Sequence, residues 1–130
     1  MATVEKFEDL EIWQEARVLA IEIYKLTLNG SFSKDNDLTW QIRKSSGSIM
    51  DNIAEGFERD GKNECIQFLS IAKGSAGETR SQLYRAFDRK HLSEETFNEL
   101  LNKSVNLIRR ISKFILYLKS TNYKGTKYKK

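Results

Sequence analysis

The stretch that decides the fold is residues 37–59, DLTWQIRKSSGSIMDNIAEGFER. Its seam positions recur every three or four residues, at Leu38, Ile42, Ser45, Ile49, Asn52 and Gly56. That interval matches the turn of an α-helix, so the segment is predicted to be helical with one buried face. Its middle reads SSGS, a poor helix-forming run in which glycine alone costs about 1 kcal/mol relative to alanine. We therefore expect another helix to approach this segment closely and offset that cost.

Three further segments show the same helical periodicity. The first occupies about residues 10–29 and ends before Gly30, a residue suited to the left-handed position after a helix. The third follows a break at residues 60–63 and carries a second run of small residues, Gly74-Ser75-Ala76-Gly77. The fourth begins after Ser93, a good N-cap residue. Two runs of small residues predict that the middle helices pack nearly backbone to backbone.

These segments and their short connections predict an all-α fold, an antiparallel up-down-up-down four-helix bundle over residues 1–118. A chain of 130 residues fits one such domain, and the absence of proline agrees with long helices. The last segment, residues 119–130, holds five lysines and no acid, and is predicted to be a basic flexible tail.

Two of the helical segments carry more apolar surface than a monomeric bundle needs to bury. The first has a second apolar set, made of Trp13, Ala20, Tyr24 and Leu28. The fourth also has a second set, made of Leu100, Leu107 and Phe114. One apolar stripe about 100° wide is enough for a bundle helix, and large exposed apolar patches are rare on monomers. The excess predicts a homo-oligomer.

Charge is unevenly distributed along the chain. Residues 1–64 hold 8 Lys and Arg against 13 Asp and Glu, whereas residues 65–130 hold 14 against 5. Basic residues of the late half and the tail are the candidates for phosphate contacts, namely Arg80, Arg109, Arg110, Lys113, Lys119, Lys124, Lys127, Lys129 and Lys130. Such a cluster attracts phosphates without reading their sequence. A solvated surface with no partner is the alternative, and the residues alone leave both open.

The sequence offers no support for an enzyme or a cofactor. A di-metal carboxylate bundle needs two Glu-x-x-His pairs, but His91 is the only histidine and is expected in a turn or at a helix end. Cys65 lies on the apolar seam of the third segment, which favours a buried, inert thiol over a nucleophile. A single cysteine fits a reducing compartment. Because no apolar run could span a membrane and residues 1–9 lack a signal-peptide layout, we expect a cytoplasmic protein.

Asn52 and Glu55 form the most distinctive polar pair in the chain. They stand at positions i and i+3, hence on one helical face, and Asn52 lies on the apolar seam. We predict a structural clamp, in which this pair forms buried hydrogen bonds to the small-residue run of the third segment. A site for a polar ligand is the alternative.

Several stretches match one bacterial family in order along the chain. They are residues 7–16 (FEDLEIWQEA), 38–45 (LTWQIRKS), 48–57 (SIMDNIAEGF) and 68–75 (FLSIAKGS), followed by Glu78 and Gln82-Leu83. Together they resemble the bacterial four-helix bundle family, also called the intervening-sequence proteins of large-subunit ribosomal RNA, from about residue 7 to 118. Members usually carry proline where this chain has Met50, which predicts a less kinked second helix. Gly77 stands where members usually have alanine, in a Leu-Ala-Glu stretch.

The resemblance implies a bundle that assembles as a homopentamer around a central channel and has no enzyme activity. Family members are encoded within ribosomal RNA insertions. Related bundles serve as accessory subunits of reverse transcriptases in diversity-generating retroelements, where they bind the polymerase and nucleic acid through a basic surface. We therefore expect a non-catalytic oligomeric module that contacts RNA, DNA or a ribonucleoprotein. The alternative is a protein-binding adaptor, for example an accessory subunit of a reverse transcriptase.

Overall fold

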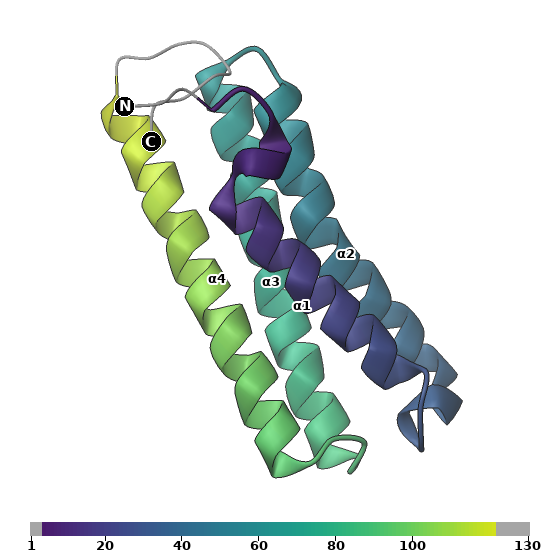
Figure 1. Ribbon diagram of the computed structural model, residues 1–130. Helices are drawn as coiled ribbons and strands as arrows, with labels where there is room; N and C mark the ends of the chain where they lie inside the picture. The colour runs from purple at the N-terminus through teal and green to yellow at the C-terminus, as the bar shows by residue number, and fades with distance from the viewer. Residues whose placement is uncertain (1–3, 122–130) are drawn as a thin grey trace.

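The computed structural model describes residues 4–121 and shows four long helices side by side (Figure 1). The helices are α1 (Glu11–Thr27), α2 (Asn36–Glu58), α3 (Lys62–Asp88) and α4 (Glu94–Ser120). Each helix runs opposite to the one before it (Figure 1). Short 3-10 turns, η1 (Phe7–Asp9) and η2 (Phe32–Lys34), lie before and after α1. The described residues contain no strand, so the predicted all-α antiparallel bundle is confirmed.

The helix ends follow the local sequence signals. Gly30 has a φ of 59°, the left-handed conformation that glycine adopts without steric cost. The Ser93 side chain accepts a hydrogen bond from the backbone N–H of Thr96 and so caps α4, as predicted. Asp35 caps α2 in the same way by accepting from Leu38. At its other end α4 continues to Ser120, slightly past the expected end of the bundle at residue 118.

The core lies where the apolar seams of the four helices meet. α2 and α3 share the most extensive contact of any helix pair, and α1 and α4 share the least extensive one of the four bundle contacts. Leu38, Ile42 and Ile49 of α2 are fully buried, as the periodicity of this segment predicts. Cys65 is 1% exposed, so its thiol is a buried core group.

The small-residue runs of α2 and α3 do meet, since Ser75 donates a hydrogen bond to Ser48 at 3.1 Å, but their glycines take no part in the close contact. A Cβ added at Gly47, Gly74 or Gly77 would meet nothing within 4 Å, because these glycines face away from the neighbouring helix. Among the glycines described, Gly56 is the tight one, since a Cβ there would lie 3.0 Å from the Phe68 Cβ. Helical period alone does not say which side of a seam faces the closest helix, so the sequence misplaced this contact.

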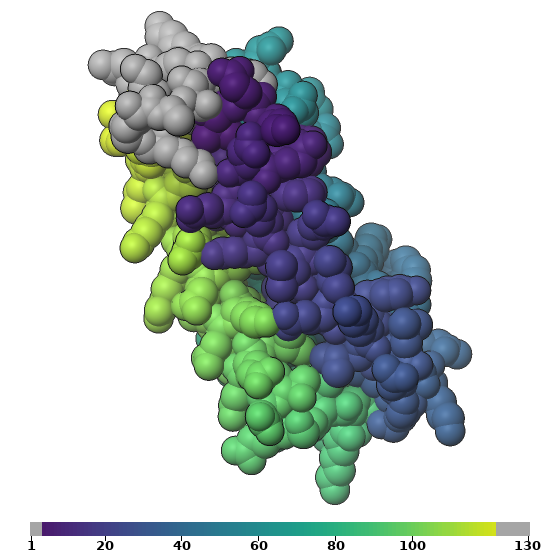
Figure 2. Space-filling view, in the orientation of Figure 1, coloured from purple at the N-terminus to yellow at the C-terminus, as the bar shows by residue number. Residues whose placement is uncertain are grey.

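The apolar excess predicted for the outer helices is resolved differently on each. On α4, Leu100 and Leu107 are buried and Phe114 is partly buried against the core. A single chain therefore buries this second set without a partner subunit. On α1, Trp13 of the predicted set is partly buried against the core, whereas Tyr24 and Leu28 are exposed. Leu28 forms an open apolar flank with Val18 and Ile21, which were not in that set, and these three residues are between 43% and 52% exposed. α1 lies along the face of the molecule shown in Figure 2. Within the described residues, no helix is long and apolar enough to cross a bilayer.

Candidate nucleic-acid interface

Exposed basic side chains gather on α3 and α4. Arg80 of α3 and both Arg109 and Lys113 of α4 are exposed and form no ion pair within residues 4–121. Lys119 is exposed in the last turn of α4. The remaining lysines expected to contact phosphates, Lys124, Lys127, Lys129 and Lys130, lie outside the described residues.

Aromatic contacts set how α3 and α4 are aligned. The Phe97 ring stacks on Phe87 with centroids 4.5 Å apart and meets the edge of Tyr84 at 5.1 Å. Because the helices are antiparallel and rise about 1.5 Å per residue, Arg109 lies at about the level of Lys73. Lys73 is also exposed and without an ion pair, and it precedes Arg80 by two helical turns.

We call the four residues Lys73, Arg80, Arg109 and Lys113 the basic face. Lys73 was not among the residues expected from the sequence, although its spacing of seven from Arg80 was a usable signal. On α3, Lys73 and Arg80 share the flank that carries Phe87, which packs against α4. All four side chains of the basic face are exposed, so an anionic partner can approach their charges.

Arg110 has a different role from its neighbours. Its Nη1 lies 3.1 Å from a carboxylate oxygen of Glu11 and 3.1 Å from one of Glu15. Lys103 forms a similar ion pair with Glu22. Both pairs join α4 to α1, where the helices pack least. In this structure two acids of the same chain pair with Arg110, so its charge is less available to a partner than the unpaired charges of Arg80, Arg109 and Lys113.

The predicted clamp of Asn52 and Glu55 is wrong as a pair. Glu55 is exposed and pairs with Arg59 of its own helix at 3.0 Å. Asn52 donates to the backbone oxygen and the hydroxyl of Ser48, which in turn accepts from Ser75 of α3 at 3.1 Å. Asn52 thus reaches the small-residue run of α3 through Ser48, and Glu55 takes no part. The spacing of three residues placed both side chains on one face of the helix, but it could not show that Asn52 lies at the buried edge of that face and Glu55 at the solvent-exposed edge.

A line of buried polar groups runs between α2 and α3. The Ser45 hydroxyl lies 2.8 Å from the Thr79 hydroxyl and 2.6 Å from Gln82 Oε1. All three side chains are at least nine-tenths buried. Buried polar groups need such partners, because an unpaired one costs about 1–3 kcal/mol. These contacts fix the register of α2 against α3.

A small pocket opens beside this polar line, between α2 and α3. Its volume is about 240 Å³. The lining residues are Trp40, Gln41, Lys44, Ser45, Ser48, Glu78 and Gln82. The Trp40 side chain is 63% exposed, and the Lys44 amino group lies 4.9 Å from the centre of its ring. We call this site the α2–α3 pocket, and no pattern in the sequence indicated it.

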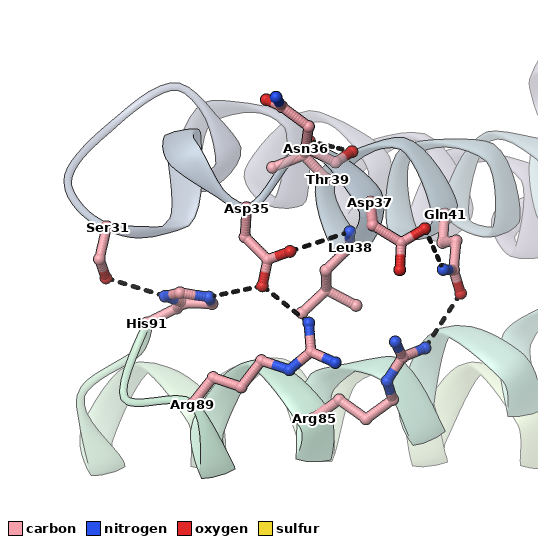
Figure 3. A network of polar contacts seen from close by, with 10 residues as sticks. All are labelled: Ser31, Asp35, Asn36, Asp37, Leu38, Thr39, Gln41, Arg85, Arg89 and His91. Atoms are coloured by element: carbon pink, nitrogen blue, oxygen red, sulfur yellow. Dashed lines mark hydrogen bonds and ion pairs between the residues drawn. The ribbon is translucent and has the colours of Figure 1, made fainter.

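A second polar cluster ties together the two connecting segments at one end of the bundle (Figure 3). Asp35 Oδ2 accepts from Arg89 at 2.8 Å and lies 2.9 Å from His91 Nε2. These hydrogen bonds, that of His91 first, lower the pKa of Asp35 from 3.8 to about 2. The other ring nitrogen of His91 lies 2.8 Å from the Ser31 hydroxyl, and the ring stacks on Phe32.

Ser31, His91 and Asp35 have the connectivity of a hydrolase triad. Here, however, the carboxylate is shared with Arg89 and also caps α2 through Leu38, so its charge serves several structural contacts. The contacts of Asp35 with Arg89 and His91, and those of His91 with Ser31 and Phe32, join the α1–α2 connection to the α3–α4 connection, and the cluster acts as a tie between them. The sequence did not reveal it, because 60 residues separate Ser31 from His91.

Within the part of the chain that the structure describes, no group of three or more His, Cys, Asp or Glu is placed to hold a metal ion. The basic face and the α2–α3 pocket are two candidate surfaces for a ligand. The first provides unpaired positive charge, and the second provides an exposed aromatic ring beside hydroxyl, amide and carboxylate groups.

Comparisons with known proteins bear on the fold and on the family. The family model described as "23S rRNA-intervening sequence protein" matches residues 8–113. A solved structure of a protein of unknown function from the S23 ribosomal protein family of Bacteroides thetaiotaomicron has a TM-score of 0.74 and 24% identity, over 80% of this chain and 97% of that chain. At this identity the likeness concerns the fold alone. The comparison with curated proteins finds no match.

Proposed function

The chain belongs to the 23S rRNA-intervening sequence protein family, and on that premise we propose that it is a non-catalytic, homo-oligomeric module that binds RNA or a ribonucleoprotein in the cytoplasm. The basic face supports the proposal. Its four cations, Lys73, Arg80, Arg109 and Lys113, have no acidic partner within residues 4–121, whereas Lys103 and Arg110 on α4 are neutralised by acids of α1.

Unpaired cations of this kind attract phosphates and release counterions when they bind. Each contact is weak, so an assembly that repeats the face gains affinity from several contacts at once. We propose a homopentamer, as the family resemblance implies. The open apolar flank of α1 (Val18, Ile21 and Leu28) supports assembly, because a partner subunit would remove it from water.

The assembly is tested by measuring the mass of the purified chain in solution. We expect the mass of five subunits, and we expect Ile21→Glu to shift the distribution toward smaller species, because a charge on the flank opposes its burial. Glu58→Gln, an exposed change on α2, is the control and leaves the mass unchanged. A monomer at every protein concentration would overturn the oligomeric part of the proposal.

RNA binding is tested by titrating a labelled structured RNA at two salt concentrations. We expect affinity to fall steeply with salt, and a triple variant (Arg80→Gln, Arg109→Gln, Lys113→Gln) to bind more weakly with a shallower salt slope, by about one unit per lost contact. The matched control replaces three exposed cations elsewhere, Arg17, Lys25 and Lys34, by Gln and keeps wild-type binding. Deleting residues 122–130 separates the share of the tail from that of the folded surface.

Two results would reject the RNA proposal. One is the absence of binding at low salt, and the other is binding that does not change with salt. A pentamer that binds no RNA would favour the second candidate, a protein-binding adaptor such as an accessory subunit of a reverse transcriptase. The exposed Leu116 of α4 (64%) and Ile71 of α3 (48%), which lie outside the α1 flank, support that candidate.

A further inference from the structure

We propose that the α2–α3 pocket holds one unpaired base of a single-stranded RNA segment, with a preference for guanine. This inference rests on the proposed RNA-binding function and extends it from phosphate attraction to the recognition of a base. Three observations carry it: a free donor inside the pocket, an exposed aromatic ring at its edge, and two uncrowded glycines on α3 between the pocket and the basic face.

The free donor is the amide nitrogen of Gln82. This side chain is 5% exposed and lines the pocket. Its Oε1 lies 2.6 Å from the Ser45 hydroxyl, a separation typical of an O–H···O bond, so the amide nitrogen points the other way. Nε2 forms no hydrogen bond within residues 4–121. Among the described residues, Glu15 Oε2 is the one side-chain polar atom that is both inaccessible to solvent and without a hydrogen bond. Gln82 Nε2 is therefore accessible to solvent. The N–H groups of Gln82 are therefore open to the pocket.

A carboxylate completes the polar side of the pocket. Glu78 precedes Gln82 by four residues, one turn of α3, and also lines the pocket. Together they present an acceptor beside a donor. The Watson–Crick edge of guanine has the matching order, with N1–H and N2–H to donate to a carboxylate and O6 to accept from an amide. Adenine and uracil each offer one donor group on that edge, so they satisfy the carboxylate less well.

Trp40 provides the stacking surface. Its side chain is 63% exposed on the surface of α2, an unusual position for a large aromatic ring. Unpaired RNA bases stack on such rings, and each stacked base contributes substantially to affinity. Lys44 lies over the ring, 4.9 Å from its centre, and adds a positive charge for the adjacent phosphate. A pocket of about 240 Å³ is below the usual range for drug-sized ligands, which suits a single base.

The surface of α3 between the basic face and the pocket carries several small residues. By the helical period, the outer side of α3 between Arg80 and Gln82 holds Gly77, Ser81 and Gly74, with the exposed side chains of Ile71 and Tyr84 to either side along the helix. A Cβ added at Gly74 or Gly77 would meet nothing within 4 Å, so no contact within the described bundle explains these glycines. Glycine inside a helix is costly, and one use for it is the close approach of another backbone. An RNA strand can cross here, with phosphates on Lys73 and Arg80 and a base in the pocket.

The test uses the fluorescence of Trp40 in the full chain. The chain has two tryptophans, so Trp13→Phe leaves Trp40 as the reporter. The probes are a uridine hexanucleotide, the same hexanucleotide with one internal guanosine, and a fully paired RNA duplex. We expect the guanosine-containing strand to quench Trp40 and to bind about tenfold more tightly than the uridine strand. The duplex, whose bases are stacked and paired, is expected to leave Trp40 unquenched.

Two exposed residues are changed to identify the contacts. Glu78→Gln is expected to remove the preference for guanosine, and Trp40→Ala to weaken binding of the guanosine strand about tenfold without changing binding of the duplex. Glu58→Gln is the matched control, because Glu58 is an exposed carboxylate of α2 away from the pocket lining. Helix content and thermal unfolding confirm that each variant is folded.

The outcomes separate this inference from the function on which it rests. Salt-dependent RNA binding with no quenching, no guanosine preference and wild-type affinity in Trp40→Ala would overturn the base pocket and leave the RNA module standing. No RNA binding at low salt would overturn both. Loss of the oligomer in Trp40→Ala would show that this face joins copies of the chain, and would also overturn the pocket.

Discussion

Replacing Asp35 by Asn is expected to destabilise the fold in a pH-dependent way. Asp35 joins the α1–α2 connection to the α3–α4 connection through Arg89 and His91 and also caps α2 (Figure 3). Asn is as good an N-cap as Asp, so the substitution keeps the acceptor for Leu38 and removes the charge. The variant therefore isolates the contribution of the carboxylate to the tie.

The magnitude follows from the pKa of Asp35, which is lowered from 3.8 to about 2. A shift of this size corresponds to roughly 2.4 kcal/mol at 1.36 kcal/mol per unit. The Arg89 side chain is 44% exposed, so solvent screens part of the interaction. We expect Asp35→Asn to lower the free energy of unfolding by about 1–2 kcal/mol at pH 7. Asp35→Ala also removes the cap and is expected to lose about 1 kcal/mol more.

The sign of the pH dependence follows from the same shift. Because the pKa of Asp35 is lower in the folded state, its stabilisation is fully present above the unfolded pKa, near 4. It is lost as the pH falls through the folded pKa of about 2. The difference in unfolding free energy between the wild-type protein and Asp35→Asn is therefore expected to shrink between about pH 4 and pH 2.

The assay is urea unfolding followed by circular dichroism, at one protein concentration because an oligomer makes apparent stability concentration-dependent. Asp51→Asn is the control, since Asp51 is an exposed carboxylate of α2 outside this cluster, and we expect it to change stability by less than about 0.5 kcal/mol. If Asp35→Asn is as stable as the wild-type protein at pH 7, or if its deficit is the same at pH 3, the reasoning about the tie is refuted.

Three further predictions test the packing. Gly56→Ala is expected to lower the unfolding free energy by about 1–3 kcal/mol, because the new Cβ would lie 3.0 Å from the Phe68 Cβ. Gly74→Ala is expected to raise it by about 1 kcal/mol, because the new Cβ would meet nothing within 4 Å and alanine is the better helix former. Equal effects in urea unfolding would contradict this assignment. Ser93→Ala removes the cap of α4 and is expected to cost about 1 kcal/mol in the same assay, and no loss would show that the cap contributes nothing. Cys65, 1% exposed, is expected to react with a thiol reagent only after denaturant is added, so rapid reaction of the folded protein would contradict its burial.

The parts of the basic face that the sequence could predict are those that depend on composition. The excess of Lys and Arg after residue 64 identified Arg80, Arg109 and Lys113, which the structure leaves exposed and without ion pairs among the described residues. The same count could not set Arg110 apart, because its partners Glu11 and Glu15 lie about a hundred positions away on α1. Ion pairs between distant helices depend on how the helices pack, and that is absent from local sequence.

The sequence by itself determined that the chain forms four helices, where they end to within a few residues, and which main stripe of each is buried. These properties depend on residues within a few turns of one another, through periodicity, capping and backbone freedom. Only the tertiary structure decided which groups meet across helices. It set Gly56 rather than Gly74 or Gly77 at the tight contact, separated Asn52 from Glu55, and brought Ser31, Asp35, Arg89 and His91 together. The rotation and level of each helix against its neighbours result from the packing of the whole core, so a single segment does not contain them.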